Sequence, residues 1–175
     1  TNSWSARDLY LHYLVQQGYL VFQLDNRGSY NRGKAFEDPI YLKLGEVELN
    51  DQIRGVEYLR SLSYVAADKI AIYGHSYGGY MAIMAMFKAA DYFAAGVSGA
   101  PVTDWALYDT HYTERYLGHP EQNAKGYTDS AVFPYANGLT GDLLIYHGMA
   151  DDNVLFTHST KLYKQLQDKG LLFDM

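Results

Sequence analysis

A short apolar run that breaks at glycine and resumes as a helix-forming segment constrains the fold of this chain most. Residues 69–81 read KIAIYGHSYGGYM, and residues 80–87 are strong helix formers without a helix breaker. We therefore predict a strand, a sharp turn and a helix, with Ser76 in the turn between Gly74 and Gly78. This G-x-S-x-G spacing is typical of a serine nucleophile held at the top of a strand; a glycine-rich turn with an idle serine is the alternative.

The composition is that of an ordinary globular domain. With 175 residues, 48% of them hydrophobic, the chain is long enough for one domain with a sizeable core. Its net charge of -6 comes from scattered charges, which argues against a nucleic-acid partner and gives no sign of an anionic membrane partner. The absence of cysteine excludes disulfides and thiolate metal sites, and it leaves the compartment open between cytoplasm and periplasm. No stretch of about 18 apolar residues predicts a membrane-spanning segment, and the first residues do not resemble a secretory signal.

The remaining periodicity predicts alternating strands and helices. Apolar runs predict strands at residues 19–24, 93–101 and 143–147, the first of them buried on both faces. Helical spacing predicts a first helix with a serine cap at Ser3 or Ser5 and an end at Gly18. It predicts a second helix on Leu49, Ile53 and Val56 that ends near Ser61. A last helix is predicted to be lined by Leu155, Leu162 and Leu166 and capped by Gly170.

This alternation predicts an α/β fold with a doubly wound, mostly parallel sheet. Ligands of such sheets bind at the carboxyl ends of the strands, where Ser76, Pro101 and Asp151 are expected to gather. The segment of residues 102–141 is long and rich in polar and aromatic residues. We expect it to form short helices and loops over that edge of the sheet.

A serine nucleophile needs a histidine base and an acid that orients the base. Asp151 follows the strand at residues 143–147 and is the predicted acid, although Asp151 and Asp152 could both be solvated loop carboxylates. Of the six histidines only His158 follows Asp151, and we expect it to be a surface residue of the last helix, with His75 packed beside the nucleophile. The base is therefore expected outside this chain.

Three separated motifs carry a resemblance that covers nearly the whole chain. They are GHSYGGY at residues 74–80, the segment from APVTDW at residues 100–105 to YTERY at residues 112–116, and HGMADDNV at residues 147–154. Together they resemble the catalytic domain of the prolyl oligopeptidase family, and within it the dipeptidyl peptidase IV-like branch.

The resemblance implies an α/β-hydrolase fold and a role for each matching residue. Ser76 would be the nucleophile, Asp151 the triad acid, Tyr77 the donor of an oxyanion-hole N–H, and Asn153 the holder of a substrate carbonyl. The pocket for proline or alanine would be lined by Val102, Trp105, Tyr108, Tyr112 and Val154. Tyr108 and Tyr112 also lie four residues apart, so on a helical turn they would point the same way; a core aromatic pair is the alternative.

The resemblance also implies that the chain is part of a larger enzyme. Residues 1–175 would be a partial catalytic domain. The triad histidine would lie beyond Met175 and the tyrosine that completes the oxyanion hole before Thr1. The parent protein would also contain a β-propeller and could be a homodimer. The absence of an initiator methionine and the apolar residues 171–175, which read as the start of a strand, favour the same view.

The expected function is that of a serine peptidase whose partner is a peptide substrate. The intact parent would release X-Pro or X-Ala dipeptides from peptide N-termini through an acyl-enzyme, with no cofactor and no metal, and this chain alone would be inactive for lack of a base. An acylaminoacyl peptidase or a prolyl oligopeptidase is the alternative within the class. A non-catalytic homologue that serves as a binding module is the alternative outside it.

Overall fold

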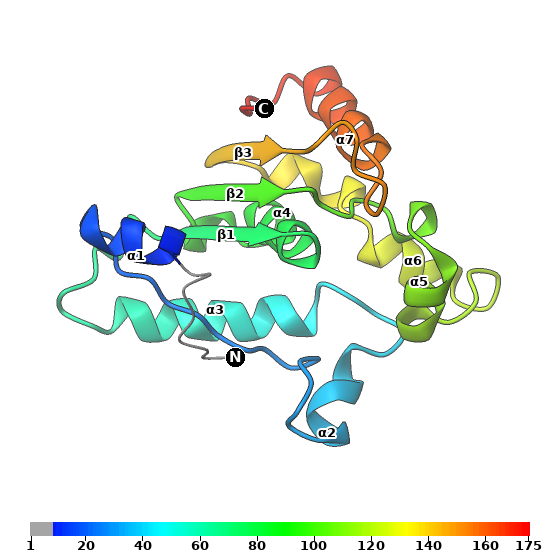
Figure 1. The fold of residues 1–175 in the computed structure, drawn as a ribbon, viewed down its shortest axis with the longest axis horizontal. Coiled ribbons are helices and arrows are strands. Elements are labelled where there is room, and N and C mark those ends of the chain that lie inside the picture. Colours follow the sequence, from blue (N-terminus) through cyan, green and yellow to red (C-terminus); the bar gives the residue numbers. More distant parts are fainter. Residues whose placement is uncertain (1–8) are drawn as a thin grey trace.

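A three-stranded parallel sheet forms the centre of the molecule (Figure 1). The structure, a computed structural model, describes residues 9–175. The strands are β1 (Ala71–His75), β2 (Ala95–Gly99) and β3 (Asp142–Tyr146), and they lie in that order. The register pairs His75 with Gly99 and Gly99 with Tyr146, so the carboxyl ends of all three strands are level. The predicted parallel sheet is confirmed.

Helices connect and flank the strands. The α-helices are α1 (Leu9–Gln16), α2 (Lys34–Glu37), α3 (Val47–Arg60), α4 (Tyr77–Lys88), α5 (Thr110–Leu117), α6 (Ala124–Ser130) and α7 (Thr157–Asp168). The short 3₁₀ helices are η2 (Asp38–Ile40), η3 (Ala90–Tyr92), η4 (Trp105–Leu107) and η5 (Phe133–Gly138). As predicted, residues 102–141 are short helices and loops. Within residues 9–175, no helix is both long and apolar enough to cross a membrane.

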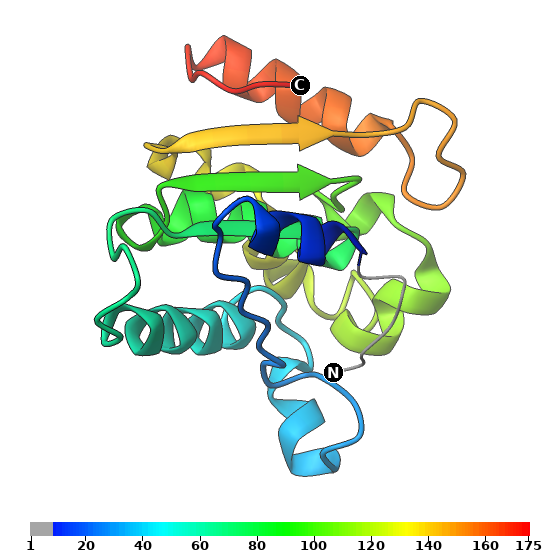
Figure 2. The same cartoon turned by 60° about the vertical axis from the view of Figure 1, so that its left-hand side comes forward.

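Helix α4 is the core helix and packs on one face of β1 and β2. Every side chain from residue 80 to residue 87 is buried, which explains why this segment is apolar on all sides. The small residues of β2 permit the close approach: a Cβ on Gly96 would lie 2.5 Å from Cγ of Met86. Figure 2 shows α4 behind the sheet and α1 in front of it.

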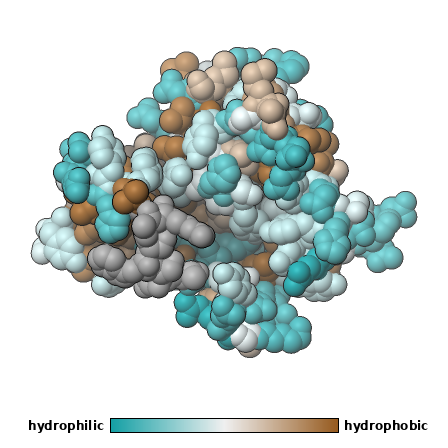
Figure 3. Space-filling model, viewed as in Figure 1, coloured by the Kyte–Doolittle hydropathy of each residue, from teal (hydrophilic) through white to brown (hydrophobic). Residues whose placement is uncertain are grey.

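The face of the sheet that points away from α4 carries exposed aromatic side chains. Tyr73 is 50% exposed and Tyr146 is 41% exposed, and their hydroxyl oxygens are 3.4 Å apart. Helix α1 touches this face through Tyr10, whose ring centroid is 5.8 Å from that of Tyr73. In Figure 3, hydrophilic side chains gather over α2 at the bottom of the view, and apolar residues lie among polar ones near α1.

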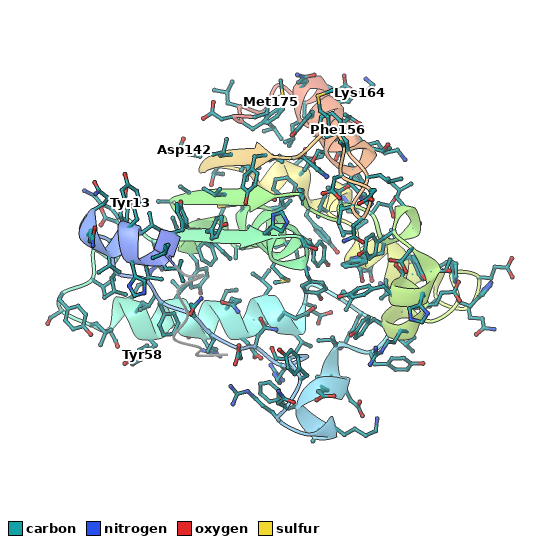
Figure 4. The ribbon with its side chains drawn as sticks, viewed as in Figure 1. Tyr13, Tyr58, Asp142, Phe156, Lys164 and Met175 are labelled. Carbon is teal, nitrogen blue, oxygen red and sulfur yellow. The ribbon has the colours of Figure 1, made fainter. Side chains whose placement is uncertain are left out.

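The strand predicted at residues 19–24 is absent, so that prediction is wrong. The segment is extended but pairs with no described strand, and Tyr19, Leu20 and Phe22 are exposed. It crosses α3 instead: a Cβ on Gly55 would lie 2.9 Å from Cδ2 of Leu24. The ring of Phe22 lies 6.2 Å from that of Tyr58, which projects from α3 in Figure 4.

The predicted ends of the helices are largely confirmed. Gly18 and Gly170 both have positive φ where α1 and α7 terminate, and α3 ends beside Ser61. The prediction that Leu155 lines the last helix is wrong, because Leu155 precedes α7 and is exposed. The serine caps at Ser3 and Ser5 lie outside the described residues.

The last residues of the chain lie beside β3. The Asp174 N–H donates to the Leu143 carbonyl at 2.8 Å, and the Ile145 N–H donates to the Asp174 carbonyl at 2.9 Å. These bonds form a single parallel bridge between Leu144 and Asp174.

Candidate active site

Ser76 sits in a strained turn between β1 and α4. Its backbone has φ 58° and ψ -118°, a conformation that residues with a side chain rarely adopt. The Ser76 N–H donates to the Gly99 carbonyl at 2.8 Å, and its carbonyl accepts the Tyr80 N–H at 3.0 Å. Strand β2 and the first turn of α4 therefore hold the serine in place from both sides.

Two glycines make this turn possible. A Cβ on Gly74 would lie 2.2 Å from the Gly78 carbonyl oxygen, and a Cβ on Gly79 would lie 2.4 Å from the Gly99 carbonyl oxygen. A Cβ on Gly78 would meet nothing within 4 Å. Of the two glycines in the G-x-S-x-G pattern, only Gly74 therefore has no room for a side chain; the second such position is Gly79, which sequence reasoning missed.

Tyr77 begins α4 and places its backbone N–H directly after the serine. The first N–H groups of an α-helix have no acceptor within the helix, so they can bind an anion. The Tyr77 ring lies 5.4 Å from the ring of Tyr80 and 5.5 Å from that of Trp105. The residue therefore joins the Ser76 turn to an aromatic cluster.

Asp151 lies in the loop after β3 and is fixed by the backbone of its own loop. Its Oδ1 accepts the N–H of Asn153 at 3.0 Å and the N–H of Val154 at 2.9 Å. Desolvation acts to raise the pKa of Asp151, but these two N–H groups and the neighbouring His147 outweigh it and lower the pKa. Asp152 is exposed. The geometry thus separates two carboxylates that composition could not rank.

His147 supports this loop from beneath, and sequence reasoning did not single it out. Its side chain is fully buried, with Nε2 2.7 Å from the Val154 carbonyl and 3.5 Å from Oδ2 of Asp151. A carbonyl only accepts, so Nε2 carries a hydrogen, and Nδ1 is hydrogen-bonded to the Ser159 hydroxyl at 2.7 Å. Phe156, at the start of α7 in Figure 4, packs edge-on against the imidazole. The inward alternation of Leu143 and Ile145 would have placed His147 on this face.

His158 is buried, so its prediction as a surface residue is wrong. It is 0% exposed, and its Nδ1 accepts the Thr103 N–H at 3.1 Å. His158, Leu162 and Leu166 follow one another at steps of four, so they form the inward face of α7. His75 is exposed, and its ring stacks on that of Tyr146 with centroids 6.2 Å apart. Among residues 9–175 no histidine hydrogen-bonds the Ser76 hydroxyl, so the catalytic base stays a prediction.

Burial of His158 predicts a pH-dependent stability. Desolvation lowers the pKa of His158 to about 4. An unfolded histidine takes up its proton near pH 6.5, so between about pH 6.5 and 4 the unfolded state binds more protons and stability falls as the pH falls, by about 3 kcal/mol in all. Urea unfolding of the chain across this range should show the loss. His158→Asn should flatten it and the exposed control His111→Asn should not; an unchanged slope in His158→Asn would contradict the assignment.

The predicted pocket residues form one aromatic cluster. The rings of Tyr108 and Tyr112 meet edge-on at 5.4 Å, and Tyr112 stacks on Trp105 at 5.9 Å with 12° between the planes. The Tyr108 hydroxyl donates to Oδ1 of Asn153 at 3.0 Å, which links the cluster to the Asp151 loop. Desolvation, followed by the neighbouring tyrosines, raises the pKa of Tyr112 to about 12.

The rings converge for a reason other than the predicted helical turn. Tyr112 is on α5, but Tyr108 precedes this helix in extended conformation, and Asp109 caps the helix by accepting the Tyr112 N–H at 2.9 Å. Val102 and Val154 are almost fully buried in the core, so they form the inner wall of the cluster rather than its open side.

A comparison with protein families places this geometry in a known group. The model of the prolyl oligopeptidase family matches residues 4–175. The chain belongs to this family. The match extends over the Ser76 turn, the aromatic cluster and the Asp151 loop. The fold is that of the α/β-hydrolases, as predicted.

Relatives within the prolyl oligopeptidase family are similar over nearly the whole chain. Dipeptidyl peptidase 8 from Mus musculus and from Homo sapiens are each 42% identical over 169 residues, which is 94% of this chain and 19% of the relative. The crystal structure of Porphyromonas gingivalis dipeptidyl peptidase 4 is 40% identical, with a TM-score of 0.92 over 95% of this chain and 24% of that one. The chain therefore spans about a fifth to a quarter of these relatives.

Proposed function

We propose that the gene product carrying this chain is a serine dipeptidyl peptidase that releases X-Pro or X-Ala dipeptides from peptide N-termini. The observation that carries the proposal is the strained Ser76 turn at the carboxyl ends of the strands, with the fixed Asp151 following β3. Ser76 precedes Asp151, as the triad serine precedes the triad acid in α/β-hydrolases, where the histidine comes last. The names of the relatives support the choice of dipeptidyl peptidase.

The proposed reaction proceeds through an acyl-enzyme. Ser76 Oγ attacks the scissile carbonyl carbon and gives its proton to a histidine, expected beyond Met175, which passes it to the leaving amine. The Tyr77 N–H stabilises the oxyanion. Water then attacks the ester carbonyl, releases the dipeptide and returns the proton to Ser76. Asp151 has Oδ1 occupied by backbone donors, so Oδ2 is available to accept the histidine N–H.

The aromatic cluster provides the proposed specificity. Tyr108 and Tyr112 offer apolar ring faces that suit a compact proline ring or an alanine methyl group. Asn153 accepts from the Tyr108 hydroxyl through Oδ1, which leaves its amide N–H groups free to donate to a substrate carbonyl.

The test compares three substrate classes on the complete gene product. We expect hydrolysis of glycyl-prolyl and glycyl-alanyl chromogenic substrates and none of N-acetylated or internal-proline peptides. Preference for a blocked N-terminus would indicate an acylaminoacyl peptidase, and cleavage after internal proline a prolyl oligopeptidase. No hydrolysis of any substrate, together with no covalent labelling of Ser76 by a fluorophosphonate, would indicate a binding protein instead.

Truncation of Tyr112 tests the pocket. Because its ring stacks on Trp105 and contacts Tyr108, Tyr112→Ala should lower kcat/KM for a prolyl substrate by about 10- to 100-fold, through loss of about 1.4 to 3 kcal/mol of substrate contact, and change the melting temperature little. The matched control is Tyr135→Ala, a half-buried tyrosine outside the cluster, which should leave kcat/KM unchanged. A large loss of melting temperature with normal kcat/KM in Tyr112→Ala would support a core role.

A further inference from the structure

A buried carboxylate lies beneath the nucleophile turn. Glu48, near the start of α3, is 1% exposed, whereas the charged residues in the second half of the helix, Arg54, Glu57 and Arg60, are exposed. Burying an ionised carboxylate is costly unless hydrogen-bond donors surround it. The Gly45 N–H approaches its two oxygens at 3.1 and 3.0 Å, and the Tyr77 hydroxyl donates to Oε1.

The turn that holds Glu48 is itself locked onto α4. Gly45 has φ +78°, and a Cβ there would lie 2.1 Å from the Tyr80 hydroxyl and 2.8 Å from Cε of Met84. The preceding Leu44 N–H donates to the Ser130 hydroxyl at 3.0 Å. Only glycine fits at this contact, so the position of the Glu48 carboxylate relative to α4 is well defined.

The bond to Glu48 fixes the residue that follows the nucleophile. The Tyr77 ring has three restraints: the hydroxyl bond to Glu48, the edge contact with Tyr80 and the contact with Trp105. Burial, and then the nearby carboxylate, raise the pKa of Tyr77 well above its usual value, so the hydroxyl keeps its proton and remains a donor. The restrained side chain and the backbone N–H share one Cα, so restraining the ring also limits how that N–H can turn.

We propose that Glu48 is a positioning residue for the oxyanion site: through the Tyr77 hydroxyl it holds the Tyr77 backbone N–H in the direction of the developing oxyanion. The inference rests on the proposed role of Tyr77 in acyl transfer. Removing an oxyanion donor outright costs about 10² to 10³ in kcat. If the N–H is present but less well directed, the loss in kcat should be smaller than this.

The experiment uses Tyr77→Phe, Glu48→Gln and the double variant in the complete gene product. Tyr77→Phe removes only the hydroxyl and keeps the ring and the N–H. Glu48→Gln keeps the size but replaces one acceptor oxygen with an NH₂ group. We expect Tyr77→Phe to lower kcat for a glycyl-prolyl substrate about 10-fold, with KM within about twofold. It should lower the rate at which a small fluorophosphonate phosphonylates Ser76, with loss of fluoride, by the same factor. The double variant should be no slower than the slower single variant, because both break one bond.

Tyr127→Phe is the matched control, since it removes a hydroxyl bond from a buried tyrosine to the Gly118 carbonyl outside the aromatic cluster. It should change melting temperature without changing kcat or the rate of phosphonylation. An unchanged rate of Ser76 phosphonylation in Tyr77→Phe, or a rise in KM alone, would overturn the inference, because Glu48 would then serve stability or the pocket. The fluorophosphonate needs no dipeptide specificity, so this result is readable even if the proposed substrates are not cleaved.

Discussion

Replacing Ser76 by alanine or by glycine in the complete gene product should lower kcat about 10⁶-fold in both variants, since no acyl-enzyme can form without the hydroxyl. The measurement is hydrolysis of a glycyl-prolyl substrate at saturating concentration, with loss of fluorophosphonate labelling as a second readout. Residual turnover within about 100-fold of the wild type in either variant would show that another nucleophile does the chemistry.

The same two variants should differ in stability. Ser76 has φ 58° and ψ -118°, which alanine tolerates no better than serine but glycine adopts without strain. Relief of about 1 to 3 kcal/mol of strain, less about 0.5 to 1 kcal/mol for the greater freedom of glycine in the unfolded chain, should raise stability by about 1 kcal/mol in Ser76→Gly alone. A melting temperature a few degrees above that of Ser76→Ala would show it. Equal melting temperatures would mean that the turn stores no strain.

Replacing Asp151 by asparagine should lower kcat about 10⁴-fold with the fold intact. The amide oxygen of the substituted side chain would still accept the N–H groups of Asn153 and Val154, so the loop should keep its shape. The other half of the amide cannot stabilise the imidazolium that forms during catalysis. The comparison of kcat with circular dichroism separates this loss from unfolding.

Asp152→Asn is the matched control for the acid. Asp152 is the next residue in the same loop, but it is exposed, so its replacement should leave kcat within about twofold of the wild type. A crippled Asp152→Asn with a nearly normal Asp151→Asn would reverse the assignment. The proposed role of Asn153 in holding substrate would then also be contradicted, because it was assigned from the same match of this loop to the family motif.

Local sequence patterns were sufficient to predict those elements whose conformation is set by residues next to one another in the chain. The segment from Gly74 to Tyr80 predicted strand, turn and helix because glycines permit the turn and an uninterrupted run of helix formers follows. The register then brought Ser76 and the Asp151 loop to the same edge of the sheet, as parallel strands require. Ser76 and Asp151 could therefore be proposed from the amino-acid sequence alone.

Sequence patterns failed where a second segment decides the outcome. Residues 19–24 have the composition of a buried strand, but a strand needs a neighbour to satisfy its backbone groups, and here the segment crosses α3 instead. Tyr108 and Tyr112 do meet, but through the extended backbone before α5 rather than through one helical turn. Spacing alone cannot show which segments come together.

The sequence by itself determined the parallel α/β framework and the turn that holds Ser76, because glycine geometry and hydrophobic periodicity act over a few residues. Only the tertiary structure decided the roles of the buried polar groups. Glu48 and His158 are residue types that composition assigns to solvent, and each is buried where a residue from another segment bonds it, Tyr77 for Glu48 and Thr103 for His158. These partners lie 29 and 55 residues away along the chain, and no local pattern records where such partners will be.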